Sequence, residues 1–480
     1  MVFPRKNTVL EVSALKSRIA QLVTAGVLTL LFGAVAALGV AFRAPLLAAT
    51  GLDLPAAAST VAPTAFPSPT PSEQPKNLLQ SAQPPKPSKA VDPDALASQL
   101  AAVDASGLAD PAGAPAVLAW EVVDVASGEV LASRNPTSAL IPASNTKTLT
   151  IVALFTAFDG TERFATRTVV EPDGTVVLVG GGDPLLTAEP VAGYPAPASL
   201  RALAEATAAK LSARSLTTVR LGYDTSHFAD DPWNDAWPGN YRDQVSPISA
   251  LWADEGKVGG VRQADPALAA AQVFAAQLGE LGVTVEGIAA ARATGQELAR
   301  VESPTVHVLA EQAMQRSNNS FTEVLGRQLA GKLGKPTTFA GATEAIRESL
   351  VAQGIWEEGA RLDDASGLSR SNRFSARMLA TANARLVNVA RLNNVFDGLP
   401  VAGVTGTLHD RFRDGPAVQA RGIARAKTGT LSQVTSLGGV TTTADGAVVA
   451  FGIIANGQVD GYRAKVWADQ LVGVITGCGC

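Results

Sequence analysis

The stretch that decides the fold is Ile141-Pro142-Ala143-Ser144-Asn145-Thr146-Lys147, which is followed by the mostly apolar run from Leu149 to Phe155. The apolar run predicts a buried helix that begins near Ser144. Residues at i and i+3 share one face of a helix, so the side chains of Ser144 and Lys147 can meet. A serine beside a lysine is a candidate nucleophile with its base, provided that burial or a nearby cation lowers the lysine pKa.

A Ser-x-x-Lys tetrad is a weak signal when it stands alone. A chain of this length holds about one by chance, and Ser13-Ala14-Leu15-Lys16 is a second match. Taken by itself, Ser144 reads more simply as a helix-capping serine followed by a surface lysine. Its assignment as a nucleophile therefore depends on other parts of the chain.

Two later motifs supply the missing groups of a site. Ser317-Asn318-Asn319 offers a second hydroxyl for proton relay and an amide to hold a substrate backbone, and Lys427-Thr428-Gly429-Thr430 offers a cation beside hydroxyls that suits a carboxylate. Helix capping and a plain edge strand with a bulge glycine are the structural alternatives for each motif alone. Their joint occurrence in this order favours a catalytic site.

With these motifs in this order, the chain resembles the class C low-molecular-mass penicillin-binding proteins, which are D-alanyl-D-alanine carboxypeptidases and endopeptidases. The resemblance extends over roughly residues 95 to 475, and further matching stretches are Gly180 to Pro184, Asp364 to Arg370, Leu399 to Gly403 and Gly406 to Leu408. It implies an α+β fold, namely a penicillin-binding or serine β-lactamase-like transpeptidase domain whose antiparallel sheet is flanked by helices. A smaller, mainly β domain is expected in the long gap between Ser144 and Ser317, an insertion that β-lactamases lack.

The resemblance also implies roles for the site residues. The expected catalytic residues are Ser144, Lys147 and Ser317, and the expected substrate-binding residues are Asn319, Lys427, Thr428, Gly429 and Thr430. The backbone N–H groups of Ser144 and Thr430 would form an oxyanion hole, and Lys427 would lower the pKa of Lys147 by like-charge proximity. Peptidoglycan stem peptides are the expected substrates and β-lactams the expected covalent inhibitors. No metal or organic cofactor is expected.

The N-terminal region predicts export. Residues 19–42 carry no charge and are long enough to cross a bilayer, which takes about 20 residues. Basic residues precede them, so residues 1–18 are expected in the cytoplasm and the catalytic domain outside the cell membrane. A cleaved signal peptide is the alternative, although its apolar core usually has about 7–15 residues. Residues 43–93 are rich in Pro, Ser and Thr and are expected to be an extended linker.

The remaining chain is expected to divide into three segments. Residues 94–165 and 266–480 form the two parts of the transpeptidase-like domain, and residues 166–265 form the inserted domain. Hairpin patterns lie at both ends of this region, at residues 117–132 and 440–454, so we expect one sheet assembled from the two ends. Cys478 and Cys480 are too close to staple a fold, which leaves a local disulfide or two free thiols.

Three other function classes are alternatives to a carboxypeptidase. The formal net charge of -4 provides no basic field, which argues against nucleic-acid binding. A β-lactamase or esterase with the same motifs differs in turning over a β-lactam quickly instead of keeping it as a lasting adduct. A catalytically silent peptidoglycan-binding module is disfavoured because no member of the three motifs is missing.

Overall fold

The computed structural model describes residues 90–109, 115–229, 232–458 and 460–480. The expected cytoplasmic segment 1–18, the anchor 19–42 and all but the end of the linker 43–93 lie outside these residues. The end of the expected linker is already part of the folded chain, since Val91 is buried and helix α3 begins at Pro93. Within the described ranges, no helix combines the length and the apolar composition that crossing a membrane requires.

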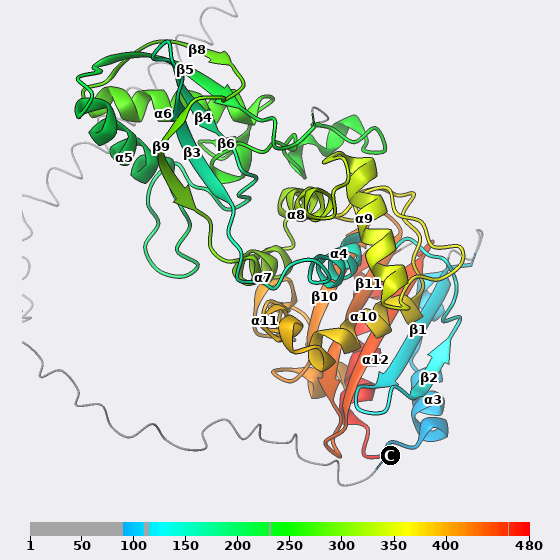
Figure 1. Cartoon of the computed structure of the whole chain (residues 1–480). Helices are drawn as coiled ribbons and strands as arrows, with labels where there is room; N and C mark the ends of the chain where they lie inside the picture. Colours follow the sequence, from blue (N-terminus) through cyan, green and yellow to red (C-terminus); the bar gives the residue numbers. More distant parts are fainter. Residues whose placement is uncertain (1–89, 110–114, 230–231, 459) are drawn as a thin grey trace, which may run out of the picture. The chain divides into compact units, whose positions relative to one another are not determined.

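The main lobe is built on one antiparallel sheet that joins the two ends of the described chain (Figure 1). Its strands, in spatial order, are β10 (Arg425–Leu431), β11 (Val434–Thr442), β12 (Val448–Asn456), β1 (Val117–Asp124) and β2 (Val130–Arg134). β1 pairs with β12 along its whole length, from Val117 opposite Asn456 to Asp124 opposite Val449. The two expected hairpins are thus confirmed, and they meet in a single sheet.

Helices cover both faces of this sheet because its strands alternate between two hydrophobic clusters. Ala119 of β1 and Ile454 of β12 belong to the cluster that holds α4 and α10. Trp120, Val122 and Phe451 belong to the opposite cluster, with α3 and α12. The main-lobe helices are α3 (Pro93–Ala101), α4 (Thr146–Leu154), α7 (Val306–Arg316), α8 (Asn319–Lys332), α9 (Phe339–Ala352), α10 (Ala376–Asn388), α11 (Asn393–Asp397) and α12 (Gly461–Gly477).

The insert is a second, mixed sheet with two helices. Its strands, in spatial order, are β8 (Thr284–Ala290), β5 (Thr218–Asp224), β4 (Val176–Val179), β3 (Ala165–Val170) and β9 (Gln296–Glu302), and its helices are α5 (Leu200–Ser212) and α6 (Pro266–Glu280). β6 (Lys257–Val258) and β7 (Val261–Arg262) form a separate two-stranded ribbon.

The insert extends beyond residue 265, where we expected it to end. β8 runs parallel to β5, and a parallel pair needs a crossover connection, which α6 provides. Phe274 and Leu278 of α6 are buried in the same cluster as Leu221 of β5. The expected boundary at residue 265 is therefore too early, and the insert reaches Glu302 at the end of β9.

One part of the insert leaves its sheet and packs on the main lobe. Between β5 and α6, Phe228, Trp237 and Trp252 form a buried cluster with Val324 of α8 and Phe339 of α9. We call residues 225–264 the excursion. Because it rests on α8 and α9, side chains of the insert reach the neighbourhood of the three sequence motifs.

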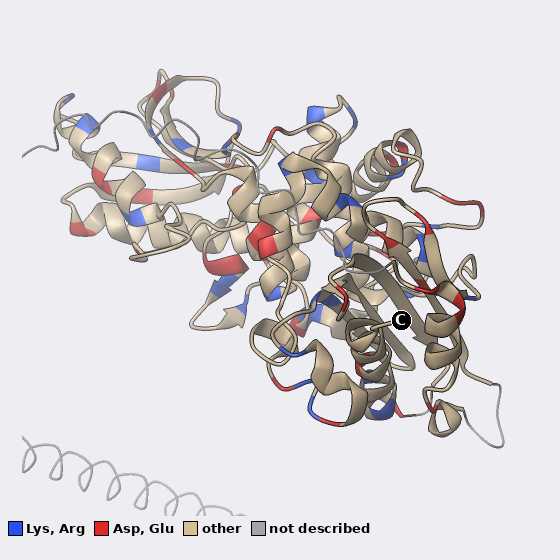
Figure 2. Cartoon of the chain, turned by 90° about the horizontal axis from the view of Figure 1, so that it is seen from below, with Lys and Arg blue, Asp and Glu red and all other residues tan. Residues whose placement is uncertain are grey.

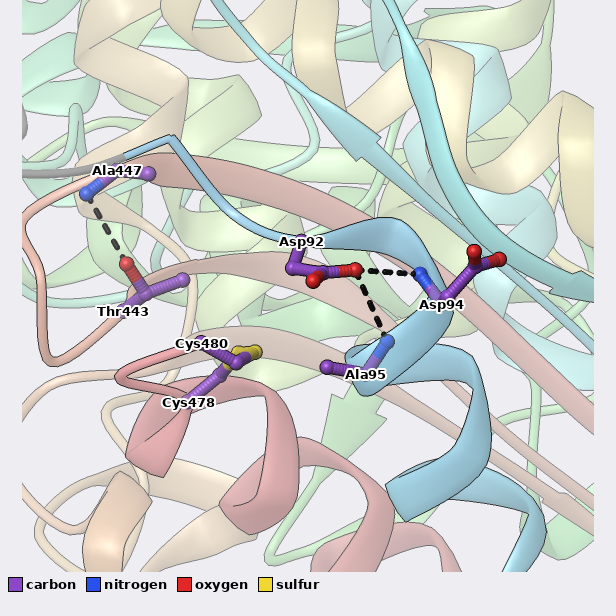
Figure 3. The surroundings of a disulfide bond; sticks show 7 residues. All are labelled: Asp92, Asp94, Ala95, Thr443, Ala447, Cys478 and Cys480. Atoms are coloured by element: carbon purple, nitrogen blue, oxygen red, sulfur yellow. Dashed lines mark hydrogen bonds between the residues drawn. A yellow bond between two sulfur atoms is a disulfide. The ribbon is translucent and has the colours of Figure 1, made fainter.

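The C-terminus is closed by a disulfide between Cys478 and Cys480 (Figure 3), which decides between the two alternatives for these cysteines. The backbone N–H of Asp92 donates to the carbonyl of Cys480 over 2.7 Å, and the Asp92 side chain caps α3 by accepting from the amides of Asp94 and Ala95. Cys480 thus binds the backbone of Asp92, the residue that caps the start of α3. Figure 2 shows Lys, Arg, Asp and Glu scattered among uncharged residues over the described chain.

Candidate active site

Ser144 lies in a single 3-10 turn, Ala143–Asn145, that leads directly into α4. The expected helix start is confirmed in position, with this tighter turn as its first part. Ala143 has φ 48°, a left-handed conformation that L-residues rarely adopt and that bends the chain sharply just before Ser144. Ser144 remains partly exposed while the neighbouring residues of the turn are buried. The hydroxyl is therefore the part of this turn that a substrate can reach.

Lys147 is fully buried and has three polar partners. Its Nζ lies 3.0 Å from Ser144 Oγ and donates to Asn319 Oδ1 and to the carbonyl of Ser366, each over 2.7 Å. A neutral amine has two N–H donors and one lone pair. The two oxygens that can only accept take both donors, so the lone pair faces the Ser144 hydroxyl, which can donate.

The electrostatics agree with a neutral Lys147. Burial lowers the pKa of Lys147 to about 7, against the smaller opposing effect of the Asp364 and Glu323 charges. Burial was one of the two causes that we expected; the other, like-charge proximity to Lys427, appears as a lowered pKa of Lys427 and is not among the causes for Lys147. Desolvation of the buried Lys147 amine accounts for its lowered pKa.

Ser317 and Lys427 form the second half of the site. Ser317 ends α7 with φ 52°, and its Oγ accepts from Lys427 Nζ over 2.7 Å. Lys427 Nζ also donates to the Thr428 carbonyl over 2.7 Å. Burial, and after it the charge of Lys147, lowers the pKa of Lys427. The buried Lys427 amine therefore binds the Ser317 hydroxyl without being exposed to solvent.

Asn318 and Asn319 divide two tasks between them. The Asn318 side chain caps α8 by accepting from the Phe321 amide, so the capping alternative describes this residue. Asn319 Oδ1 faces Lys147, and its Nδ2 donates to the Gln244 carbonyl over 3.0 Å. The Asn319 amide thus links the base to the excursion of the insert.

β10 is the edge strand that carries Lys427, Thr428, Gly429 and Thr430. A Cβ on Gly429 would lie 2.2 Å from Ser436 Oγ, 2.6 Å from the Pro142 carbonyl and 3.1 Å from the Ser144 backbone nitrogen. Only a glycine allows the strand to approach the turn of Ser144 this closely. Thr430, one residue further, is exposed beside Ser144.

The residues of all three motifs meet at one cleft of about 380 Å³. Ser144, Ser317, Asn319 and Thr430 line it. Lys147 and Lys427 are buried and reach it through their contacts with Ser144 and Ser317. Thr428 is not among the lining residues, and its hydroxyl donates to Thr407 Oγ1. In the described part of the chain, no group of three or more His, Cys, Asp or Glu is placed to hold a metal ion.

The cleft also has lining residues outside the three motifs, and those of the excursion were not predicted. Asn240, Tyr241, Asp243 and Gln244 of the excursion form one wall, and Gly367 and Leu368 form part of another. One sequence signal points to the excursion, because three of the six tryptophans occur at positions 233, 237 and 252. Such clustering of large aromatic side chains in a chain with 5% aromatic residues marks a segment that packs against another part of the fold.

Known proteins resemble this chain over most of its described length. Residues 99–260 and 253–477 match the model of the D-Ala-D-Ala carboxypeptidase 3 (S13) family. A carboxypeptidase of Mycobacterium tuberculosis is 35% identical over 379 residues, covering 76% of this chain and 81% of the relative. Carboxypeptidase DacB of Mycolicibacterium smegmatis is 32% identical over 400 residues, covering 79% and 84%.

Solved structures show the same fold. Penicillin-binding protein 4 of Haemophilus influenzae superposes with a TM-score of 0.63 at 22% sequence identity, over 80% of this chain and 98% of that one. A second structure of that protein, in complex with a β-lactam, superposes with a TM-score of 0.58. The transpeptidase-like α+β fold expected from the sequence is confirmed.

Proposed function

This chain belongs to the D-Ala-D-Ala carboxypeptidase 3 (S13) family, and from that premise we propose that it removes the terminal D-alanine of peptidoglycan stem peptides through an acyl-enzyme on Ser144. The observation that carries this proposal is the environment of Lys147. Its amine meets the Ser144 hydroxyl, and its other two contacts are acceptors only. That arrangement suits a general base.

In the acylation step, Ser144 Oγ attacks the carbonyl between the two D-alanines, and Lys147 takes the hydroxyl proton. The new bond joins Oγ to the carbonyl carbon, and the bond to the leaving D-alanine nitrogen breaks. Ser317, which is in contact with Lys427, relays this proton from Lys147 to that nitrogen, so Lys147 is neutral again when the amine leaves. The N–H groups of Ser144 and Thr430 stabilise the oxyanion. A water molecule then releases the shortened peptide and frees Ser144.

Substrate binding divides between the two sides of the cleft. The terminal carboxylate is held by the Thr428 and Thr430 hydroxyls, in the field of the buried Lys427. Asn319 keeps one Nδ2 hydrogen for the acyl side of the substrate, because its contacts with Lys147 and Gln244 use Oδ1 and one N–H. Gly429 contributes by its small size, which brings Thr430 to Ser144.

The location of the enzyme is the second part of the proposal. The uncharged run of residues 19–42, with basic residues before it, supports a single membrane anchor, and residues 43–93 support an extended linker to the catalytic domain. This arrangement holds the Ser144 site on the external side of the membrane, where peptidoglycan lies.

The test is covalent labelling of the full chain with a fluorescent penicillin, which the β-lactam complex of the Haemophilus relative motivates. We expect a lasting label on the wild type and none on Ser144→Ala. Label on Ser144→Ala, or no label on either protein, would refute the assignment of Ser144. Rapid release of hydrolysed penicillin from the wild type would favour a β-lactamase instead.

A further inference from the structure

Glu323 is a buried glutamate whose charge acts on Lys147, the proposed base, and the mechanism above gives it no role. Glu323 is on α8, one helical turn after Asn319, and only 1% of it is exposed. Its Oε1 accepts from the Ser366 amide over 2.8 Å, and its Oε2 accepts from the Ala365 amide over 3.2 Å. Both carboxylate oxygens therefore bind the backbone of one loop, residues 364–369, which we call the clamp loop.

The clamp loop bears directly on the catalytic residues. The Ser366 carbonyl is one of the two acceptors of Lys147, and the Ala365 carbonyl accepts from Thr150 Oγ1 over 2.8 Å. A Cβ on Gly367 would lie 1.9 Å from the Ala143 carbonyl, so the loop is in close contact with the turn that presents Ser144. A displacement of this loop moves the partner of Lys147.

A second buried carboxylate, Asp364, belongs to the clamp loop itself and accepts hydrogen bonds from inside and outside the loop. Asp364 accepts from the Gly367 and Ser369 amides and from the Asn372 side chain, over 2.6 to 2.8 Å. It also accepts from Trp237 Nε1 of the excursion over 2.8 Å. Asp364 therefore determines the conformation of the clamp loop, while Glu323 joins that loop to α8, the helix that also carries Asn319.

We propose that Glu323 is a positioning residue for acyl transfer: by binding the Ala365 and Ser366 amides, it holds the Ser366 carbonyl on Lys147 Nζ and so directs the amine lone pair at Ser144. This inference rests on the proposed function, because it assigns a role toward the same nucleophile and base. Asn319 and Ser366 both depend on α8 in this arrangement. One helix thereby places both acceptors of Lys147.

The charges around Lys147 add a measurable consequence. The ionisable groups that act on Lys147 or feel its charge are Glu323, Asp364 and Lys427. Burial, reinforced by the charge of Asp364, raises the pKa of Glu323 to about 8, so this carboxyl is largely protonated near pH 7, where Lys147 titrates. Only an ionised Glu323 raises the pKa of Lys147. A side chain of the same shape that never ionises therefore changes the contacts of the clamp loop without moving the titration of Lys147 near pH 7.

The decisive experiment measures acylation of the full chain by the fluorescent penicillin across pH for the wild type and for Glu323→Gln. Glutamine keeps one acceptor oxygen but offers an N–H group to the second amide, so the loop loses one contact. We expect the maximal acylation rate constant to fall about 10- to 100-fold, with non-covalent affinity for the penicillin unchanged. The acid limb of the pH–rate profile is expected to stay at the wild-type pH, because Glu323 is already largely protonated where Lys147 titrates.

Glu121→Gln is the matched control. Glu121 is also 1% exposed, lies on β1 and pairs with Arg377, without any contact to the clamp loop. We expect it to change the melting temperature but neither the acylation rate constant nor its pH profile. If Glu323→Gln folds and shows the wild-type rate constant, the positioning role is wrong.

Thr150→Val provides an independent arm should Glu323→Gln not fold. It removes the Thr150–Ala365 bond from the other side of the clamp loop and leaves every charge in place. We expect a lower rate constant with an unmoved acid limb, and rescue by Thr150→Ser. A wild-type rate in Thr150→Val overturns the inference. Absence of label on the wild type refutes the proposed function instead, so the two failures are distinguishable.

Discussion

Gly429→Ala is the substitution whose effect follows most directly from the geometry. The new methyl group would lie 2.2 Å from Ser436 Oγ and 2.6 Å from the Pro142 carbonyl, whereas non-bonded heavy atoms prefer about 3.5 Å. The Ser436 hydroxyl cannot easily rotate away. It donates to the Pro142 carbonyl over 2.6 Å and accepts from Asn145 Nδ2 over 2.8 Å.

The strain must therefore move β10 away from the turn of Ser144 by about 1 Å. Overpacking of this kind typically costs about 1–3 kcal/mol of stability. The effect on catalysis is expected to be larger in relative terms, since a misplacement of about 1 Å can lower a rate about 100-fold. Thr430 moves with the strand and leaves its position beside Ser144.

The assay pairs a thermal melt with the acylation rate constant for the fluorescent penicillin. Gly461→Ala is the control, because Gly461 opens α12 with no atom within 4 Å of the added methyl group, and both quantities are expected to stay at wild-type values. A folded Gly429→Ala protein that acylates at the wild-type rate would contradict the claim that this glycine sets the spacing of the cleft.

Three further predictions concern ionisable groups. Acylation of the wild type is expected to rise with pH through about 7, the pKa of Lys147, because the neutral amine is the base; a flat profile from pH 5 to 9 would exclude that role. Lys427→Ala is expected to slow hydrolysis of substrates with a free terminal carboxylate much more than that of esters, and equal losses in parallel kinetics would contradict its place in carboxylate binding. Burial raises the pKa of Asp183 to about 7, so its contribution to stability is present at low pH and is lost as pH rises from about 4 to 7. The melting temperature of Asp183→Asn should therefore increase relative to that of the wild type between pH 4 and pH 8. A difference in melting temperature that does not change with pH would argue against this linkage.

Local patterns in the sequence were sufficient for much of the fold. Mostly apolar runs next to turn residues predicted the hairpins that became β1–β2 and β11–β12, because a strand with two covered faces needs apolar side chains on both. The apolar run after Ser144 predicted α4. The end of the insert could not be found in this way. Its last strands, β8 and β9, are largely exposed, so their sequence carries little apolar pattern from which a buried strand could be predicted.

By itself, the sequence selected the residues to which we assign the chemistry. Ser144 is identified by its position ahead of Ser317, Asn319 and Lys427, and the spacing of Ser144 and Lys147 on one turn brings that pair together. The tertiary structure decided why Lys147 can act as a base. Its two acceptors, on Asn319 and Ser366, come from positions 172 and 219 residues away in the chain, and the burial that lowers its pKa exists only after α4, α8 and the clamp loop have packed together. The physical reason is that solvation and hydrogen bonding depend on neighbours in space, which a local motif does not specify.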